Sequence, residues 1–229
     1  MTEPTEPADA PATALLLGAT GLVGGHVLDQ LLAHPAYRRV TVLGRRPLAR
    51  MDPKLDQRTA DFDRLHEHAI SFAVDDVFCC LGTTIKTAGS QEAFRRVDHG
   101  YVVEAARLAA EHGARRYLLV TAAGANARSR IFYNRVKGQA EDAVRALPLE
   151  GVVILRPSLL MGDREEERPM ESLAQRVMPA LDRAMVGPLR RYRPVEAATV
   201  ARAMVRLARE QPRGVRVVES DEIQRMGEA

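Results

Sequence analysis

The chain has 229 residues, which suits one α/β domain with its own hydrophobic core. Its composition, 46% hydrophobic and 28% charged, is ordinary for a globular protein, and a formal charge of +3 is too mild to indicate nucleic-acid binding. No apolar run approaches the roughly 20 residues of a membrane span, and the N-terminus lacks the segments of a signal peptide. These features predict a cytoplasmic protein that binds neither nucleic acid nor membrane.

Residues 1–13 contain several prolines and carboxylates and almost no large apolar side chains. Such a segment cannot offset the conformational entropy that ordering it would cost. We therefore predict a disordered tail over residues 1–13 and a single domain over residues 14–229.

A strand, a glycine turn and a helix are predicted at the start of this domain. Residues 14–17 are a continuous apolar run, and residues 23–32 place apolar side chains on one helical face. Three glycines between and within them follow a G-x-x-G-x-x-G spacing: Gly18, Gly21 and Gly24. One glycine would permit a tight turn, one would let the backbone approach a pyrophosphate, and one would let the helix pack closely on the strand. The pattern predicts a dinucleotide site at the helix N-terminus, with an ordinary strand-to-helix turn as the alternative.

The second predicted strand, residues 40–43, ends at Gly44, Arg45 and Arg46. A site that selects NAD usually has an Asp or Glu here, which holds the ribose 2′-hydroxyl. Two guanidiniums stand here instead, and they can bind a 2′-phosphate through charge-assisted hydrogen bonds. The pair indicates NADP(H), and two solvated arginines in an arginine-rich chain are the alternative.

A weak third strand is predicted over residues 58–60, followed by Asp61. Asp61 is a candidate contact for the adenine, although an Asp at a strand end is often a helix cap.

A fourth buried strand is predicted over residues 77–84, and it contains two adjacent cysteines, Cys79 and Cys80. Adjacent cysteines can form neither a stabilising disulfide nor a metal site between them, so we interpret them as buried strand residues and predict no metal. Because ligands bind at the carboxyl ends of strands in such sheets, Leu81, Gly82 and Thr83 are predicted to line the nicotinamide-ribose side of the cleft.

A long helix is predicted over residues 91–112, and a fifth strand over residues 117–120. Tyr133 and Lys137 then lie four residues apart in a helical window, so they share one face of a helix. A cation beside a phenol favours phenolate, as a general acid for a carbonyl or a general base for an alcohol requires. A surface Tyr/Lys pair is the alternative.

The last third of the chain begins with a sixth predicted strand over residues 151–155. A charged loop over residues 163–168 and a helix around residues 171–178 follow. A further helix opens at residues 194–196, and the last strand covers residues 215–218. The pattern of residues 221–229 predicts no particular secondary structure.

Four stretches are specific enough to suggest a family. They are residues 79–84 (CCLGTT), Arg96-Val97-Asp98 with Tyr101-Val102, Tyr133-x-x-x-Lys137-Gly138, and residues 156–164 (RPSLLMGDR) running into Arg168-Pro169. On these motifs the chain resembles the short-chain dehydrogenase/reductase superfamily, specifically its atypical branch around the human Tat-interacting protein. The likeness runs from about Leu15 to past Arg202.

The resemblance implies a doubly wound Rossmann-type α/β fold with a parallel sheet. It also implies a small C-terminal lobe over residues 157–195 that builds the substrate pocket, with a plain surface excursion as the alternative. It implies NADPH binding by a set of residues from several strand ends: Thr20, Gly21, Leu22, Val23, Arg45, Arg46, Leu81, Gly82, Tyr133 and Lys137, with Leu160 and Arg168 closing over the cofactor. It also implies that Tyr133 transfers the proton. Related reductases carry a serine pair where this chain has Thr121-Ala122-Ala123, so Thr121 keeps one hydroxyl.

Two functions follow from these observations. The first is an NADP(H)-dependent oxidoreductase that acts on a small carbonyl or alcohol, with Tyr133 as proton donor or acceptor, Lys137 holding the ribose and Thr121 steadying the substrate oxygen. The second is a non-catalytic regulatory or redox-sensing protein that binds NADPH and presents a surface to a protein partner.

Overall fold

A computed structural model of the chain describes residues 11–162 and 193–228. The charged loop predicted over residues 163–168 and the helix predicted around residues 171–178 lie outside the described residues.

The core of the molecule is a seven-stranded sheet in the order β3-β2-β1-β4-β5-β6-β9, and every neighbouring pair of strands is parallel. Its strands are β1 (Ala12–Leu17), β2 (Tyr37–Gly44), β3 (Leu55–Thr59), β4 (Asp76–Cys79), β5 (Arg116–Val120), β6 (Gly151–Arg156) and β9 (Gly214–Glu219). The chain winds outward in both directions from β1 and β4. The predicted doubly wound Rossmann-type fold is confirmed, and in such folds ligands bind where the winding reverses.

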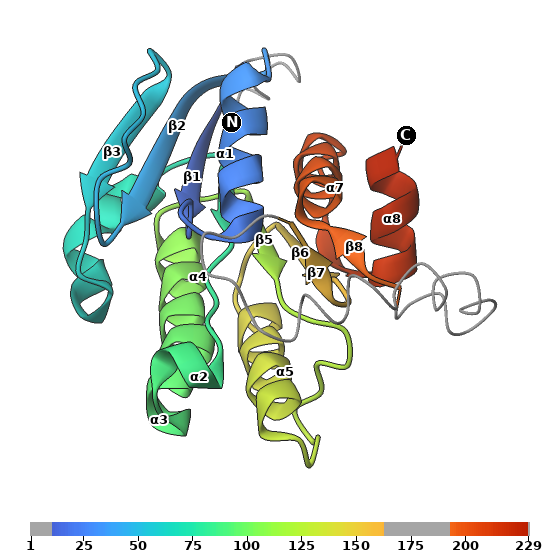
Figure 1. The fold of residues 1–229 in the computed structure, drawn as a ribbon. Helices are drawn as coiled ribbons and strands as arrows, with labels where there is room; N and C mark the ends of the chain where they lie inside the picture. The colour runs from blue at the N-terminus through green and yellow to red at the C-terminus, as the bar shows by residue number, and fades with distance from the viewer. Residues whose placement is uncertain (1–10, 163–192, 229) are drawn as a thin grey trace, which may run out of the picture.

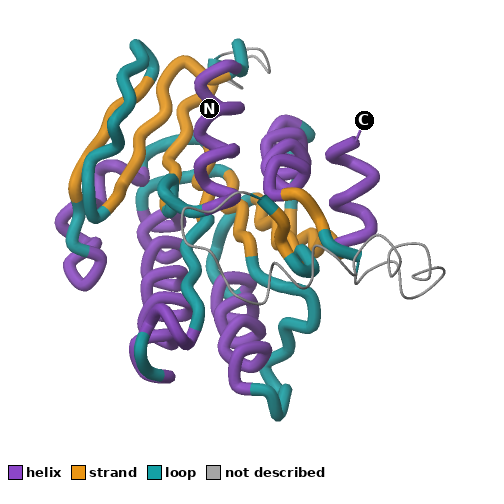
Figure 2. The backbone as a smooth tube through the Cα atoms, viewed as in Figure 1, coloured by secondary structure: helices purple, strands orange, loops and turns teal. Residues whose placement is uncertain are grey.

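Helices cover both faces of the sheet (Figure 1). One face carries α1 (Leu22–Ala33), α7 (Ala197–Arg209) and α8 (Ser220–Glu228), and the other carries α4 (Val102–Glu111) and α5 (Phe132–Arg145). Figure 2 shows the strands as one layer between these helices. The alternation of side chains along β1 explains the two cores: Leu16 packs with the first group, and Leu15 and Leu17 pack with the second.

The remaining elements are short. They are the 3₁₀-helical segment η1 (Phe62–Phe72), α2 (Ile85–Ala88), α3 (Gln91–Arg95), the π-helical segment η2 (Arg96–Tyr101), and the two strands β7 (Leu160–Met161) and β8 (Val195–Glu196). β7 and β8 pair in parallel as a separate small sheet.

The first strand begins two residues before the predicted start. Ala12 and Thr13 belong to β1, although the prediction placed them in the tail. The Ala12 N–H donates to the Ala36 carbonyl at 2.7 Å, and both the N–H and the hydroxyl of Thr13 donate to Asp75 Oδ2 at 2.7 and 2.9 Å. These partners are distant in sequence, so local composition did not reveal the start of the strand.

One predicted helix needs correction, and one helix was not predicted. The helix predicted over residues 91–112 is divided, because η2 inserts a wider π-helical turn between α3 and α4. The C-terminal residues, whose sequence pattern predicted no particular element, form α8. Ile223 and Met226 lie three residues apart on that helix and pack into the core beside α7.

Candidate active site

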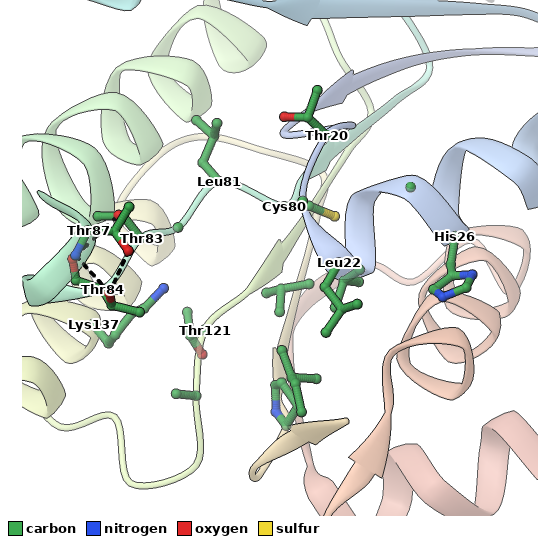
Figure 3. Close-up of a pocket in the computed structure, with 18 of the residues that line it drawn as sticks. Thr20, Leu22, His26, Cys80, Leu81, Thr83, Thr84, Thr87, Thr121 and Lys137 are labelled. Atoms are coloured by element: carbon green, nitrogen blue, oxygen red, sulfur yellow. Dashed lines mark hydrogen bonds between the residues drawn. The ribbon is translucent and has the colours of Figure 1, made fainter. Parts of the chain in front are cut away.

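A cleft of about 1130 Å³ opens at the carboxyl ends of β1, β4 and β5. The first turn of α1 forms one wall, and residues 80–84 after β4 form the opposite wall (Figure 3). Residues 120–123, Tyr133, Lys137 and residues 157–160 complete the lining at one end, and Arg45 and Arg46 lie at the other. The volume is sufficient for a dinucleotide and a small substrate.

Two glycines allow the turn before α1 to pack closely against neighbouring backbone. Gly18 has a φ of +85°, and a Cβ there would lie 2.5 Å from the Cys80 carbonyl oxygen. A Cβ on Gly24 would lie 2.0 Å from the Gly18 carbonyl oxygen, so Gly24 allows α1 to pack against the turn. Neither of these two lines the cleft, whereas Gly21 does, together with Thr20, Leu22 and Val23.

The N-terminus of α1 is open to a ligand. Its N-cap is Gly21, no side chain from residues 11–162 or 193–228 caps the helix, and its first turn has no acidic residue. The free N–H groups and the partial positive charge of the helix therefore favour an anion at this wall of the cleft.

Arg45 and Arg46 follow β2, line the cleft and are exposed. In the part of the chain that the structure describes, neither arginine forms an ion pair. Asp61 is not among the residues that line the cleft. Its Oδ1 accepts a hydrogen bond from the Asp63 N–H at 3.0 Å and caps η1, which favours the cap over the adenine contact.

Tyr133 and Lys137 both line the cleft from α5. The Tyr133 ring packs against Phe94 with ring centres 5.4 Å apart. Lys137 Nζ lies 2.7 Å from Asp98 Oδ1, and the Lys137 and Asp98 side chains are only 5% and 0% exposed. Burial alone would lower the pKa of Lys137, but the negative charge of Asp98 and the proximity of Tyr133 outweigh it and raise that pKa.

The residues after β4 are tied to the same ion pair. Leu81, Gly82 and Thr83 line the cleft as predicted. The strand itself ends at Cys79, and the Thr83 N–H donates to Asp98 Oδ2 at 2.9 Å. Of the two cysteines, Cys79 is buried in the strand, while Cys80 is partly buried and lines the cleft.

The Thr121 hydroxyl lies at the cleft but directs its proton elsewhere. It donates to Glu141 Oε1 at 2.7 Å, and Glu141 also accepts two hydrogen bonds from Arg156. A hydroxyl has a single proton, so in this arrangement Thr121 does not donate to a substrate oxygen. Ala122 and Ala123 beside it carry no hydroxyl. No side chain of residues 121–123 therefore has a proton to donate to a substrate oxygen, which is the role predicted for Thr121.

The segment after β6 covers the start of α1. Leu160 lines the cleft and pairs with Val195, and a Cβ on Gly162 would meet the Leu22 side chain at 2.8 Å. Leu160 is therefore at the predicted site. Arg168 lies outside the described residues.

Sequence reasoning assigned no role to Asp98 or Glu141. Glu141 is four residues after Lys137 and eight after Tyr133, so the same helical spacing could have drawn attention to it. Asp98 lies in a motif that supported the resemblance, but its partners come from α5 and the loop after β4.

Comparison with known proteins identifies the family. Residues 18–211 match the sequence model of a family described as NAD(P)H-binding. The chain belongs to this NAD(P)H-binding family. Protein HTATIP2 of Rattus norvegicus is 36% identical over 197 residues, which cover 84% of this chain and 79% of that protein. Protein fmp52-1, mitochondrial, of Aspergillus terreus is 39% identical over 170 residues, covering 72% and 73% of the two chains.

Solved structures of other proteins share the fold of this NAD(P)H-binding protein. MoeE5 in complex with UDP-glucose and NAD superposes with a TM-score of 0.66 at 18% identity, covering 94% of this chain and 80% of that one. The Bordetella bronchiseptica enzyme WbmH in complex with NAD+ superposes with a TM-score of 0.67 at 16% identity, covering 91% of this chain and 75% of that one. At these identities the likeness supports the Rossmann-like fold alone. The family match and the shared fold together show that the chain is an NAD(P)-binding protein with an oxidoreductase-like fold.

The expectation of a cytoplasmic protein is wrong on the evidence of the fungal relatives. Those of Aspergillus terreus, Emericella nidulans and Aspergillus clavatus, 36–40% identical to this chain, are all named mitochondrial. Within residues 11–162 and 193–228, no helix combines the length and apolar character needed to cross a membrane.

Proposed function

We propose that this NAD(P)H-binding protein is an NADP(H)-dependent oxidoreductase of the short-chain dehydrogenase type that acts on a small carbonyl or alcohol. The observation that carries the proposal is that Tyr133 and Lys137 line the same cleft as the start of α1 and Arg45 and Arg46, which form no ion pair among the described residues. When bound, a nicotinamide cofactor would supply a hydride to the substrate carbon or accept one from it.

The residues of the cleft fit such a cofactor. The Leu22 and Val23 backbone N–H groups in the first turn of α1 are suited to bind the phosphates. A glycine at position 18 is required because a Cβ there would lie too close to the Cys80 backbone. Arg45 and Arg46 are free to bind a 2′-phosphate, which only NADP(H) carries.

Proton transfer is assigned to Tyr133. In reduction its O–H gives a proton to the carbonyl oxygen, and in oxidation its phenolate takes the proton of the alcohol. Lys137, whose ammonium is held in a buried ion pair with Asp98, lies one helical turn after Tyr133 on the same face of α5.

Cofactor selectivity is tested with the Arg45→Ala/Arg46→Ala protein. NADPH and NADH are each titrated against this variant and the wild type by calorimetry or fluorescence. The variant should lose about 1.5–3 kcal/mol of NADPH binding for each lost contact and far less of NADH binding. Equal losses for the two nucleotides would overturn the assignment to NADP(H). The Arg38→Ala/Arg39→Ala variant, which changes two exposed arginines at the other end of β2, serves as the matched control.

The reaction is tested with a panel of aldehydes and ketones, followed at the nicotinamide absorbance. Tyr133→Phe keeps the ring on Phe94 but removes the proton, so turnover should fall about 10²–10⁴-fold while NADPH still binds. Tyr101→Phe is the control, because the Tyr101 hydroxyl donates to Asp63 and the residue is not part of the cleft lining. A wild type that turns over the panel, with Tyr133→Phe equally active, rules out this role for Tyr133.

A second function is favoured by one observation. The Thr121 hydroxyl donates to Glu141, and the next two residues are alanines. A cleft with that arrangement also suits a regulatory protein that binds NADPH and presents its surface to a protein partner. NADPH binding without turnover across the whole panel would support this alternative and contradict the oxidoreductase.

A further inference from the structure

Asp29 on α1 brings a carboxylate to a cleft that we propose binds an anionic cofactor. The residues of α1 beyond its first turn that line the cleft continue the helical face of Leu22, because they recur at three- and four-residue spacing: Gly25, His26 and Asp29. Asp29 is the only acidic residue among the described residues that line the cleft. A negative charge at this position opposes the binding of phosphates, which are themselves negative.

Arg50 balances this carboxylate. Arg50 Nη1 forms a hydrogen-bonded ion pair with Asp29 Oδ1. Arg50 lies four residues after Arg46 in the loop between β2 and β3, so the pair joins α1 to the loop that carries Arg45 and Arg46. Arg50 is not one of the described residues that line the cleft, so its effect on a bound ligand passes through Asp29.

Other contacts hold this loop in place. Gln57 on β3 accepts the Leu48 N–H at 2.8 Å through Oε1 and donates from Nε2 to the Arg50 carbonyl at 2.6 Å. Lys54 Nζ donates to two backbone carbonyls at the C-terminal end of α1, both at 3.0 Å. The Asp29 and Arg50 side chains are 56% and 38% exposed, and exposed ion pairs contribute little to stability. The charge of Arg50, rather than its hold on the loop, is therefore what matters to the cleft.

We propose that Arg50 is a specificity-determining residue for NADP(H), which neutralises Asp29 so that a 2′-phosphate can bind at Arg45 and Arg46 without repulsion from a carboxylate. A 2′-phosphate adds a charge of about −1.5 to −2 at neutral pH, so an unbalanced Asp29 disfavours NADPH more than NADH. This inference rests on the proposed function, in which Arg45 and Arg46 bind that phosphate.

Four proteins test the inference: the wild type, Arg50→Ala, Asp29→Asn and Asp29→Asn/Arg50→Ala. NADPH and NADH are titrated against each at low salt by calorimetry. In Arg50→Ala the Kd for NADPH should rise about three- to tenfold, and the Kd for NADH less than about twofold. Asp29→Asn should bind NADPH at least as tightly as the wild type. The double variant should return to within about twofold of the wild type, because no carboxylate remains to be balanced.

Two other roles for Arg50 predict different results. If the ion pair served to hold the loop, Asp29→Asn would weaken NADPH binding as much as Arg50→Ala does. If Arg50 bound the phosphate directly, the double variant would stay as weak as Arg50→Ala. Either result would overturn the inference.

The effect should also depend on salt, because Asp29 is exposed. At about 1 M NaCl the Debye length is only about 3 Å, so the Kd of Arg50→Ala for NADPH should approach that of the wild type at the same salt concentration. A difference that persists at high salt would contradict the inference.

Arg107→Ala is the matched control for the loss of one positive charge. Arg107 is 41% exposed, pairs with Glu104 and Glu111 on α4 and does not line the cleft. This variant should keep both dissociation constants within about twofold of the wild type. An effect on NADPH equal to that of Arg50→Ala would show that net charge alone is responsible, and the inference would fail.

Failure of the proposed cofactor assignment would look different. A wild type that binds NADH as tightly as NADPH contradicts the assignment to NADP(H). The neutralisation then predicts that Arg50→Ala weakens both nucleotides equally and that adding Asp29→Asn restores both, and a lack of recovery contradicts the neutralisation as well. Because both side chains are exposed, the thermal midpoints of the variants should stay within about 3 °C of the wild type, so changes in affinity are measured on folded protein.

Discussion

Two buried ion pairs lie at opposite ends of the same sheet. Asp76 at the start of β4 binds Arg116 at the start of β5, and the Tyr37 hydroxyl donates to Asp76 at 2.7 Å. At the other end, Asp98 binds Lys137. Both carboxylates are 0% exposed, and the two cations are 7% and 5% exposed. Burial and chemistry are therefore almost the same in the two pairs.

The difference between the pairs is what lies next to them. Tyr37 covers the amino-end pair, and none of its three residues lines the cleft. Burial raises the pKa of Asp76 against the opposing effect of Arg116, and burial together with Asp76 raises the pKa of Tyr37 far above its usual range. At the carboxyl end, Lys137 itself lines the cleft beside Tyr133. A buried ion pair thus indicates function only where a ligand can reach it.

The largest expected effect comes from breaking the amino-end pair with Arg116→Met. This change leaves the Asp76 carboxylate buried without its cation, so the free energy of unfolding should fall by about 3–5 kcal/mol. NADPH affinity of the folded protein should stay within about twofold, because the pair is remote from the cleft. Urea unfolding and nucleotide titration measure the two quantities. Arg213→Met, at a side chain that is 86% exposed, is the control. A loss of NADPH affinity with stability retained would show that the two ends are not independent.

Glu141→Gln should produce an intermediate effect. Glu141 is a third buried carboxylate, and it accepts hydrogen bonds from Thr121, Arg156 and Arg145. An amide cannot satisfy these donors equally, so thermal unfolding should show a loss of about 1.5–3 kcal/mol. Because the Lys137–Asp98 pair remains intact, NADPH affinity should change little. A drop in NADPH affinity without a drop in thermal stability would instead show that Glu141 contributes to ligand binding.

Asp61→Ala tests a carboxylate at the same end of the sheet that does not face the cleft. Loss of the cap on η1 should cost about 1 kcal/mol of unfolding free energy. The dissociation constants for NADPH and NADH should stay the same within error. Asp56→Ala, at a carboxylate that pairs with Arg58 on β3, is a suitable comparison. A selective loss of nucleotide binding in Asp61→Ala would instead support the hypothesis that Asp61 contacts the adenine.

The smallest expected effect is a pH dependence at the amino end. His34 packs edge-on against Tyr37, and its Nδ1 accepts the Ala36 N–H at 3.1 Å. Burial, followed by Arg209 and Lys54, lowers the pKa of His34. The stability that neutral His34 contributes is complete above the unfolded pKa of about 6.5 and is lost as pH falls through the lower folded value.

Unfolding free energies at pH 7.5 and pH 5.5 should therefore differ by well under about 1 kcal/mol from this group, with the lower value at pH 5.5. His34→Gln should reduce the difference. A difference that is unchanged in His34→Gln must come from other groups.

Each of the three parts of the cleft that could be predicted from the sequence consists of residues that are close in the chain. The glycine turn and the Tyr133/Lys137 pair each lie within seven residues, and the arginines directly follow a β-branched strand. Thr121 shows the limit of that approach. Its position at the end of β5 was predictable, but the destination of its proton depends on Glu141, twenty residues away.

The sequence indicated most of the strands and helices of the parallel doubly wound sheet and the glycine turn between β1 and α1. Hydrophobic periodicity and the backbone freedom of Gly18 are local properties, and they act before any tertiary contact forms. Only the tertiary structure decided where β1 begins, that the C-terminal residues form α8, and which carboxylates balance the buried cations. Those outcomes depend on Asp75, α7 and η2, whose positions relative to their partners arise when the sheet assembles and removes these groups from water.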